Sequence, residues 1–460
     1  MSSTDSTGVT NTGRGAIGVR LSVMMFFQLF VWGAWYVTVS NYMTKIGLAD
    51  SIGHAYTVGP IAAIISPFFL GMIADRFFST ERVLGVMHLI GGAALLAAPA
   101  VADSCVKAGS APMGESAPFI NPAHVPFLAV LLLHMLCYMP TLGLTNTISF
   151  HNMSEPAKQF PLVRVFGTIG WIAPGLIFGF LAKRWVPAGT DMGDKAAVNA
   201  AIAGLPHFFY LAGGAGVMLG LYSFSLPHTP PPAAGRKATI RDVLGLDALA
   251  LMKEPSFLIF ILSSFLICVP LAAYYSFAPV FAGAMGISPD NVPIRMSYGQ
   301  VSEVLFMVVM PFFFARLGVK WMLAVAMLAW AVRYGLFAAA PGAPTETAVA
   351  LVVAGIILHG ICYDFFFVTG FIYVDRKAPK EIRGQAQGLL VLVTQGLGLG
   401  VGAQIISRLV AHHTATDSAG AVVRNWPQIW LIPCIAAGVI LVLFLALFRE
   451  SAARGGSDAP

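Results

Sequence analysis

The stretch LVVAGIILHGICYDFFFVTGFIYV (351–374) is long and apolar enough to cross a lipid bilayer, yet it contains the acid Asp364. A second apolar stretch, MSYGQVSEVLFMVVMPFFF (296–314), contains Glu303. A carboxylate at membrane depth costs a few kcal/mol or more, so such residues normally face a cavity and mark a functional site. The two stretches therefore predict a membrane protein with an internal polar site.

The composition of the whole chain agrees with a membrane solvent. Of 460 residues, 57% are hydrophobic and 10% are charged, whereas soluble domains average about 25% charged. The net charge of +6 is spread over short loops, which argues against a nucleic-acid partner. Four of the five cysteines lie in apolar stretches, and no Cys/His spacing suits a metal or a disulfide framework.

Twelve apolar stretches reach roughly the 20 residues that a helix needs to cross a bilayer. The sequence therefore predicts an all-α integral membrane protein with twelve transmembrane helices, the first of them uncleaved. The stretches are 17–43, 56–74, 83–102, 125–150, 163–184, 206–226, 255–285, 298–316, 320–341, 347–374, 384–411 and 428–448.

Basic residues predict the orientation. If both termini are cytoplasmic, the cytoplasmic segments hold 18 of the 27 Lys and Arg residues and the outer segments hold 8. The remaining one, Arg333, lies inside the ninth stretch and could pair with an acid or extend outward, so we assign it no role.

The longest polar interruption, LPHTPPPAAGRKATIRDVLGLDALALMKEP (226–255), divides the stretches six and six. Two six-helix halves around a central cytoplasmic loop are typical of parallel repeats related about the membrane normal. We therefore expect a cytoplasmic tail at 1–16, a six-helix bundle at 17–226, a central cytoplasmic loop at 227–254, a second bundle at 255–448 and a cytoplasmic tail at 449–460.

The loop after the second stretch reads GMIADRFFSTER (71–82), and FFFARLGVK (312–320) stands at the equivalent place in the second half. The first resembles the loop signature of the major facilitator superfamily, which implies the major facilitator fold. Gly71 lets helices approach, while Asp75 and Arg76 can pair with a helix end as a gating latch. Ordinary topological charge is the alternative.

Motifs for ATP hydrolysis, metalloprotease chemistry and serine hydrolysis are absent from the sequence. We therefore expect no catalytic residues, no cofactor and no metal, and energy for uphill transport must come from an ion gradient.

Glu303 and Gln300 lie one helical turn apart on the same face. A carboxylate beside a carboxamide offers donors and acceptors to a neutral, polyhydroxylated ligand. Burial raises the pKa of carboxyl groups in general, and an acid that titrates near neutrality can carry a proton. A structural hydrogen bond to a neighbouring helix is the alternative.

His359 and Tyr363 share a helix face, and Asp364 lies about 100° away from it. This offset predicts that His359 and Tyr363 face the cavity. Asp364 could act as a proton relay or as a structural partner of another helix.

Arg164, Thr168 and Trp171 form one stripe that combines a cation, a hydroxyl and a ring. Such a stripe suits a flat heterocycle with a hydroxylated arm, although Arg164 could instead extend to the cytoplasmic interface.

Pro270 and Pro279 are expected to bend or open the seventh stretch around Tyr274 and Tyr275, because broken helices often mark transport sites.

Several motifs resemble the nucleoside:proton symporters of the major facilitator superfamily, in order from about residue 17 to 450. The resemblance implies a bacterial inner-membrane permease that imports nucleosides with protons by alternating access, without an obligate protein partner. The motifs are YMPTLGLTNTISF (138–150), FPLVRVFGTIGW (160–171), LGLDALALMK (244–253), GQVSEVLF (299–306) and HGICYDFFFVTGFIYVDRKAP (359–379).

The resemblance also implies roles for individual residues. Arg164 and Thr168 match an arginine and a threonine that bind the nucleoside in the family, and Gln300 and Glu303 match its ligand-binding Gln and Glu. Glu303 is then the expected proton carrier, with Asp364 second.

The chain departs from the family pattern in three places. Trp171 replaces a Phe, Ala272 and Tyr275 replace a Gln and an Asn, and His359 and Tyr363 replace a Tyr and a Phe. These departures resemble a sister branch of the family. The changes at Ala272 and Tyr275 leave open a sugar, glycoside or other polar metabolite as the cargo. A membrane enzyme or a sensor that transports nothing is the alternative of a different class, and the absence of a catalytic motif argues against the enzyme.

Overall fold

The computed structural model describes residues 11–69, 78–108, 120–231, 246–379, 382–418 and 422–449. The proposed gating residues Gly71, Asp75 and Arg76 lie outside the described residues. The chain divides into two compact units. Unit 1 contains Met1–Thr239 and Tyr275–Ser297, and unit 2 contains Ile240–Tyr274 and Tyr298–Pro460.

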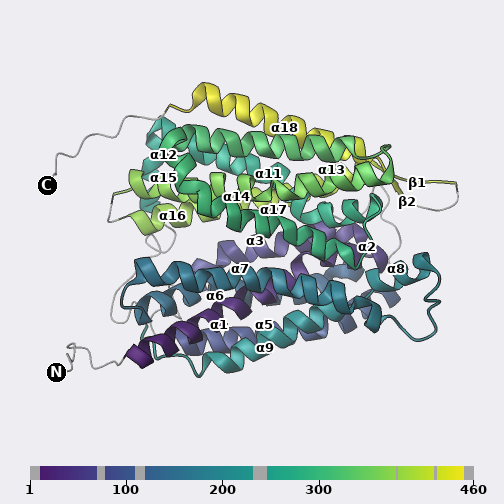
Figure 1. Cartoon of the computed structure of the whole chain (residues 1–460), viewed down its shortest axis with the longest axis horizontal. Coiled ribbons are helices and arrows are strands. Elements are labelled where there is room, and N and C mark those ends of the chain that lie inside the picture. Colours follow the sequence, from purple (N-terminus) through teal and green to yellow (C-terminus); the bar gives the residue numbers. More distant parts are fainter. Residues whose placement is uncertain are drawn as a thin grey trace. The chain divides into compact units, whose positions relative to one another are not determined.

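Unit 1 is helical (Figure 1). Helix α1 packs against α7, and α5 packs against both α6 and α9. Short 3-10 turns at Ala49–Ser51, Pro122–His124 and Ala182–Trp185 join neighbouring helices. The helices are α1 (Asn11–Tyr36), α2 (Val39–Lys45), α3 (Ile52–Phe69), α5 (Thr80–Lys107), α6 (Val125–Asn152), α7 (Pro156–Leu181), α8 (Lys195–Ala203) and α9 (His207–Ser223).

Glycines allow these helices to approach closely, as is common where packing rather than hydrophobicity holds membrane helices together. A Cβ at Gly33 of α1 would lie 2.6 Å from the carbonyl oxygen of Trp171 in α7. A Cβ at Gly92 of α5 would lie 2.8 Å from the backbone nitrogen of Val217 in α9. Backbone atoms cannot swing aside as side chains do, so only glycine fits at these two crossings.

The segment Tyr275–Ser297 belongs to unit 1 although it lies in the second half of the chain. The Lys183 ammonium is 3.2 Å from the carboxylate of Asp290. A Cβ at Gly175 would lie 3.3 Å from the carbonyl oxygen of Pro293. An ion pair and a close helix contact therefore hold this segment against the end of α7.

Unit 2 is also helical, with one short hairpin (Figure 1). Unit 2 begins in the described residues with a 3-10 helix, Leu246–Lys253. Two π-helical turns, Asp364–Val368 and Leu392–Gly398, interrupt its α-helices. Two helices are shared between the units: α11 (Pro255–Ala284) belongs to unit 2 up to Tyr274, and α12 (Asn291–Ala339) belongs to it from Tyr298 on. The other elements of unit 2 are α13 (Thr345–Ile357), α14 (His359–Tyr363), α15 (Thr369–Lys377), α16 (Arg383–Val391), α17 (Leu399–His412), β1 (Thr414–Thr416), β2 (Val422–Arg424) and α18 (Trp426–Leu447).

Ten helices among the described residues are long and apolar enough to cross a membrane. Helix α12, with 49 residues, covers two of the predicted spans, and its backbone leaves helical geometry at Gly318 (φ 64°, ψ −178°). That positive φ favours glycine, so Gly318 is where the eighth span ends and the ninth begins. Helix α3 covers most of the second span. The predicted all-α membrane fold is confirmed.

One expectation requires correction, and one element was not foreseen. Helix α11 continues through Pro270 and Pro279 rather than opening there. Each proline removes a single amide donor and leaves the other helical hydrogen bonds in place. The Tyr334 hydroxyl donates to the Pro270 carbonyl oxygen at 2.9 Å and joins α11 to α12. The antiparallel pair of β1 and β2, in which Thr414 faces Arg424, was not expected between the last two helices.

We predict that Gly92→Ala lowers the thermal unfolding temperature of the detergent-solubilised protein. The new methyl group would meet the backbone of α9, and overpacking of this kind costs about 1–3 kcal/mol. Gly214→Ala in α9 is the matched control, because a Cβ there meets nothing within 4 Å. Equal unfolding temperatures for the two variants would show that the crossing tolerates the methyl group.

Candidate functional site

The two acid-bearing stretches lie against each other in unit 2. The backbone N–H of Gly360 donates to the Ser302 hydroxyl at 3.0 Å, and a Cβ at Gly360 would lie 2.5 Å from the Ser302 carbonyl oxygen. A Cβ at Gly299 would lie 3.0 Å from the Cβ of His359. Two glycines thus bring α12 and α14 into backbone contact and place Glu303 beside His359.

Glu303 is half-buried, and its Oε2 lies 4.0 Å from Nε2 of His359, which is buried. Gln300, one turn earlier on α12, is half-buried as well. The sequence predicted that Glu303 and His359 belong to one polar site, and the structure brings them together. It also gives Glu303 a nearby imidazole, which hydropathy alone could not identify.

Arg333 completes this cluster from the second half of α12, and its side chain is 0% exposed. Its Nε donates to the carbonyl oxygen of Gly355 at 3.0 Å, and its guanidinium carbon lies 4.3 Å from the centre of the Tyr274 ring. An arginine that extended to the membrane surface would be exposed, so that alternative is excluded. In the sequence, the position of a cation in the middle of an apolar span was the one feature that indicated a buried role for Arg333.

His359 lies between the cation and the acid. A guanidinium nitrogen of Arg333 is 3.4 Å from Nδ1 of His359. Guanidinium groups only donate, so Nδ1 accepts, and the proton of a neutral imidazole then sits on Nε2. That N–H faces Glu303. The Tyr274 ring stacks on His359, with ring centroids 5.4 Å apart at 17°, and keeps the imidazole in this orientation.

Tyr363 extends the aromatic face of α14. Its ring centroid is 5.6 Å from that of His359 and 4.8 Å from that of Phe367. The predicted sharing of one face by His359 and Tyr363 therefore appears as a direct ring contact.

Asp364 is 0% exposed and begins the π-helical turn Asp364–Val368. Within the described part of the chain, neither of its carboxylate oxygens has a hydrogen-bond partner. A structural ion pair, one of the two roles considered for this residue, therefore finds no support. Single π-helical turns are frequent at functional sites.

The predicted stripe on α7 lies in unit 1. Arg164 is exposed, while Thr168 and Trp171 are half-buried. The ring of Trp171 packs edge-on against Trp32, with centroids 5.3 Å apart. Of the three stripe residues, Trp171 alone is part of the aromatic cluster described next.

Four rings of unit 1 form one cluster, which we call the aromatic cluster: Trp32, Tyr36, Trp171 and Tyr275. The Tyr36 and Tyr275 centroids are 5.9 Å apart, and those of Tyr36 and Trp171 are 6.4 Å apart. Tyr275 therefore packs in unit 1, whereas Tyr274 packs on Arg333 and His359 in unit 2. From the sequence both tyrosines were predicted to belong to the same site, because adjacent residues give no indication of packing in different units.

A buried hydrogen-bond network supports the aromatic cluster. The side chain of Gln28, 0% exposed, donates to the Thr141 hydroxyl at 2.7 Å and lies 2.8 Å from Nε2 of His88. The Tyr138 hydroxyl donates to the Gln28 carbonyl oxygen at 2.6 Å. The Tyr138 ring lies 5.5 Å from that of Trp32, so the network fixes one edge of the cluster.

The chemistry available differs between the units. Unit 1 offers ring faces, a hydroxyl and an exposed guanidinium, whereas unit 2 offers two acids, an imidazole and a buried guanidinium. Among the residues described, no group of three or more His, Cys, Asp or Glu could hold a metal ion. The arrangement suits reversible binding of a polar, partly aromatic molecule and of a proton.

Comparisons with known proteins show what the chain as a whole is similar to. A family model described as nucleoside H+ symporter matches residues 16–453. The chain is 38% identical to the Escherichia coli protein named "Putative nucleoside transporter YegT" over 437 residues, 94% of each chain. It is 30% identical to nucleoside permease NupG of Escherichia coli over 451 residues, 95% of this chain and 97% of that protein.

Solved structures give the same result. A crystal structure of nucleoside transporter NupG superposes with a TM-score of 0.76 at 28% identity and covers 95% of this chain and all of that one. A D-xylose–proton symporter superposes with a TM-score of 0.66 at 14% identity, over 95% and 98% of the two chains, which shows the fold alone.

We predict that Arg333→Lys lowers the thermal unfolding temperature. Lysine keeps the charge but lacks the planar fork that reaches the Gly355 carbonyl, His359 and the Tyr274 ring together, and each lost contact costs about 1 kcal/mol. Arg82→Lys, at an exposed position, is the control. An unchanged unfolding temperature for Arg333→Lys would mean that the cluster depends on the charge alone.

Proposed function

This chain belongs to the nucleoside H+ symporter family, and from that membership we propose that it imports a nucleoside together with a proton. The family membership confirms the resemblance seen in the motifs. The chain is a membrane transporter of the major facilitator type, and the family match over residues 16–453 carries this conclusion. For a bacterial inner membrane, the excess of basic residues on one side supports cytoplasmic termini.

We propose that an aromatic side chain stacks on the nucleoside base, and each unit offers one candidate for this role. Trp171, held by Trp32, presents a half-buried ring in unit 1, and Tyr363 presents one in unit 2. Stacking pairs of this kind contribute about 0.5–1.5 kcal/mol beyond the area they bury. Tyr274, which is 1% exposed, then supports the site rather than contacts the base, whereas the half-buried Tyr275 of the aromatic cluster is a further candidate contact.

Polar residues would bind the base edge and the ribose. Gln300 and Glu303 offer a carboxamide and a carboxylate from one face of α12, and Arg164 and Thr168 offer donors from α7. A ribose presents hydroxyl groups that both donate and accept, so a site with both kinds of partner suits it.

Glu303 is the proposed proton carrier. Its Oε2 lies 4.0 Å from Nε2 of His359. As a carboxylate Glu303 only accepts hydrogen bonds, whereas as a neutral acid it can also donate one to a ligand. Proton binding therefore changes what Glu303 offers to the nucleoside, which couples the two cargoes. Arg333 lies on the other side of the imidazole, with a guanidinium nitrogen 3.4 Å from Nδ1 of His359. Asp364, buried beside Tyr363, is the second candidate.

A second cargo class keeps the same mechanism. Ala272 is 2% exposed and apolar, and Tyr275 packs against Tyr36, at positions where the resembled permeases carry polar side chains. Fewer polar side chains would then be available to hydrogen-bond the nucleobase. This favours a sugar, a glycoside or another polar metabolite as the alternative cargo.

We expect radiolabelled uridine to accumulate in permease-deficient cells that produce this protein, and unlabelled nucleosides to compete with it. Sugars and glycosides in excess should leave the uptake unchanged, and a protonophore should abolish it. Competition by a sugar, with no effect of nucleosides, would instead establish the alternative cargo.

We predict that Glu303→Gln abolishes accumulation of the nucleoside against a gradient. The amide cannot take up a proton, yet it keeps hydrogen-bonding capacity, so exchange of labelled for unlabelled nucleoside across proteoliposomes should persist. Glu346→Gln, in the exposed first turn of α13, is the matched control and should transport normally. Accumulation by Glu303→Gln at the wild-type level would sink the assignment of the proton carrier.

A further inference from the structure

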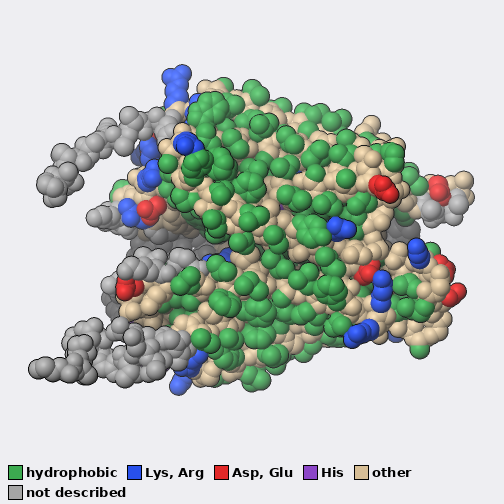
Figure 2. Space-filling view, viewed as in Figure 1, with side chains coloured by type: hydrophobic (Ala, Val, Ile, Leu, Met, Phe, Trp, Pro, Cys, Tyr) green, Lys and Arg blue, Asp and Glu red, His purple; other side chains and the backbone are tan. Residues whose placement is uncertain are grey.

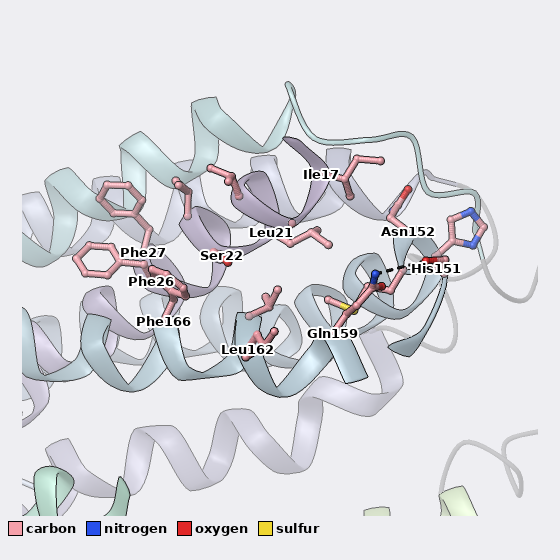
Figure 3. Close-up of a pocket in the computed structure, with 16 residues that line it drawn as sticks. Ile17, Leu21, Ser22, Phe26, Phe27, His151, Asn152, Gln159, Leu162 and Phe166 are labelled. Carbon is pink, nitrogen blue, oxygen red and sulfur yellow. Dashed lines mark hydrogen bonds between the residues drawn. The ribbon is translucent and has the colours of Figure 1, made fainter. Parts of the chain in front are cut away.

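Unit 1 contains a cavity of about 880 Å³ that none of the proposed nucleoside-binding residues lines. Its wall consists of the N-terminal part of α1, the C-terminal end of α6 with the turn that follows, and the first part of α7 (Figure 3). A volume of this size is typical of a site for a drug-sized molecule.

The cavity is apolar at one end and polar at the other (Figure 3). Phe26 and Phe166 lie at the apolar end, and His151, Asn152 and Gln159 lie at the polar end. His151 is exposed and, among the described residues, makes no hydrogen bond of its own. An occupant must therefore be amphipathic, with an apolar body and a polar group near His151.

The length of the cavity matches one leaflet of a bilayer. Ile17 and Phe27, both in the wall, are ten residues apart on α1, and a helix rises about 1.5 Å per residue, so they are about 15 Å apart. The hydrocarbon core of a bilayer is about 30 Å thick, which gives about 15 Å for each leaflet.

The contact between α1 and α7 separates this cavity from the proposed nucleoside site. A Cβ at Gly170 of α7 would overlap the carbonyl group of Phe26 in α1, so the two backbones touch there. Leu162 and Phe166 of α7 line the cavity, whereas Arg164 and Thr168, two residues further on in each case, lie on the nearly opposite face.

The cavity also reaches the surface of the apolar helices. Leu162 is 71% exposed and Val19 is 64% exposed, and both line it. Figure 2 shows that hydrophobic side chains cover much of the face in view. Such a surface is in contact with lipid in a membrane protein, so an occupant can enter from the bilayer.

We propose that this cavity binds one phospholipid of the leaflet that surrounds the N-terminal end of α1. One acyl chain lies between α1 and α7 against Phe26 and Phe166, and the head group meets His151, Asn152 and Gln159. The site is independent of the nucleoside site, so it stands whether or not the cargo is a nucleoside.

Gly18 provides a test of this site. Gly18 lines the cavity, and a Cβ at this position meets nothing within 4 Å. The side chain introduced by Gly18→Leu can therefore extend into the cavity and take up space there. Gly214→Leu is the matched control, since Gly214 is also helical, also has no atom within 4 Å of a Cβ, and lies outside the cavity.

The proteins are reconstituted in vesicles of equal parts phosphatidylethanolamine and phosphatidylglycerol, extracted with a delipidating detergent and weighed intact by native mass spectrometry. We expect the wild type and Gly214→Leu to retain one phospholipid. In Gly18→Leu the occupancy should fall roughly fivefold or more, because filling a packed site is costly. The retained mass identifies the head group. Equal retention by both variants, or retention of detergent alone, would overturn the proposal.

A second measurement keeps the test valid if Gly18→Leu folds poorly. A Phe166→Trp protein in vesicles with brominated acyl chains should show more tryptophan quenching than the wild type, which has eight tryptophans of its own. Excess non-brominated phospholipid should reverse that extra quenching slowly if the lipid is bound. Reversal at the rate of bulk lipid exchange would show contact with ordinary surrounding lipid and would refute a site.

Discussion

A guanidinium inside a membrane protein must find its partners within the protein, because the surrounding hydrocarbon accepts no hydrogen bonds. Arg333 meets this requirement with the carbonyl of Gly355, the imidazole of His359 and the ring face of Tyr274. The rest of the polar site in unit 2 follows from this arrangement. Arg333 contacts one nitrogen of His359, and the other nitrogen lies 4.0 Å from the carboxylate of Glu303.

Unit 1 meets the same requirement without charge. Gln28, His88, Thr141 and Tyr138 satisfy one another through neutral hydrogen bonds between α1, α5 and α6. Fully satisfied networks of this kind hold side chains rigidly. The polar side chains of this network in unit 1 are neutral, whereas the polar cluster of unit 2 contains an acid and a guanidinium.

Much of the fold could be predicted from the sequence, since a membrane helix must be apolar over a length that the bilayer sets. The spans and the shared face of His359 and Tyr363 follow from periodicity along one helix. The role of Arg333 could not be predicted in this way. Its partners are 22 and 26 residues away in the sequence, and hydropathy carries no information on which helices touch. The π-helical turn at Asp364 was equally hidden, since it changes hydrogen bonding without changing composition.

Helix α11 passes from one unit to the other without a break, and the boundary is a single peptide bond between Tyr274 and Tyr275. Pro270 and Pro279 lie on either side of that bond, and each removes one backbone hydrogen bond from the helix. Because the helix is continuous at this bond, Tyr274 and Tyr275 are adjacent residues of one α-helix. The ring that packs on Arg333 and the ring that packs on Tyr36 are therefore anchored to neighbouring positions of the same backbone, although they belong to different units.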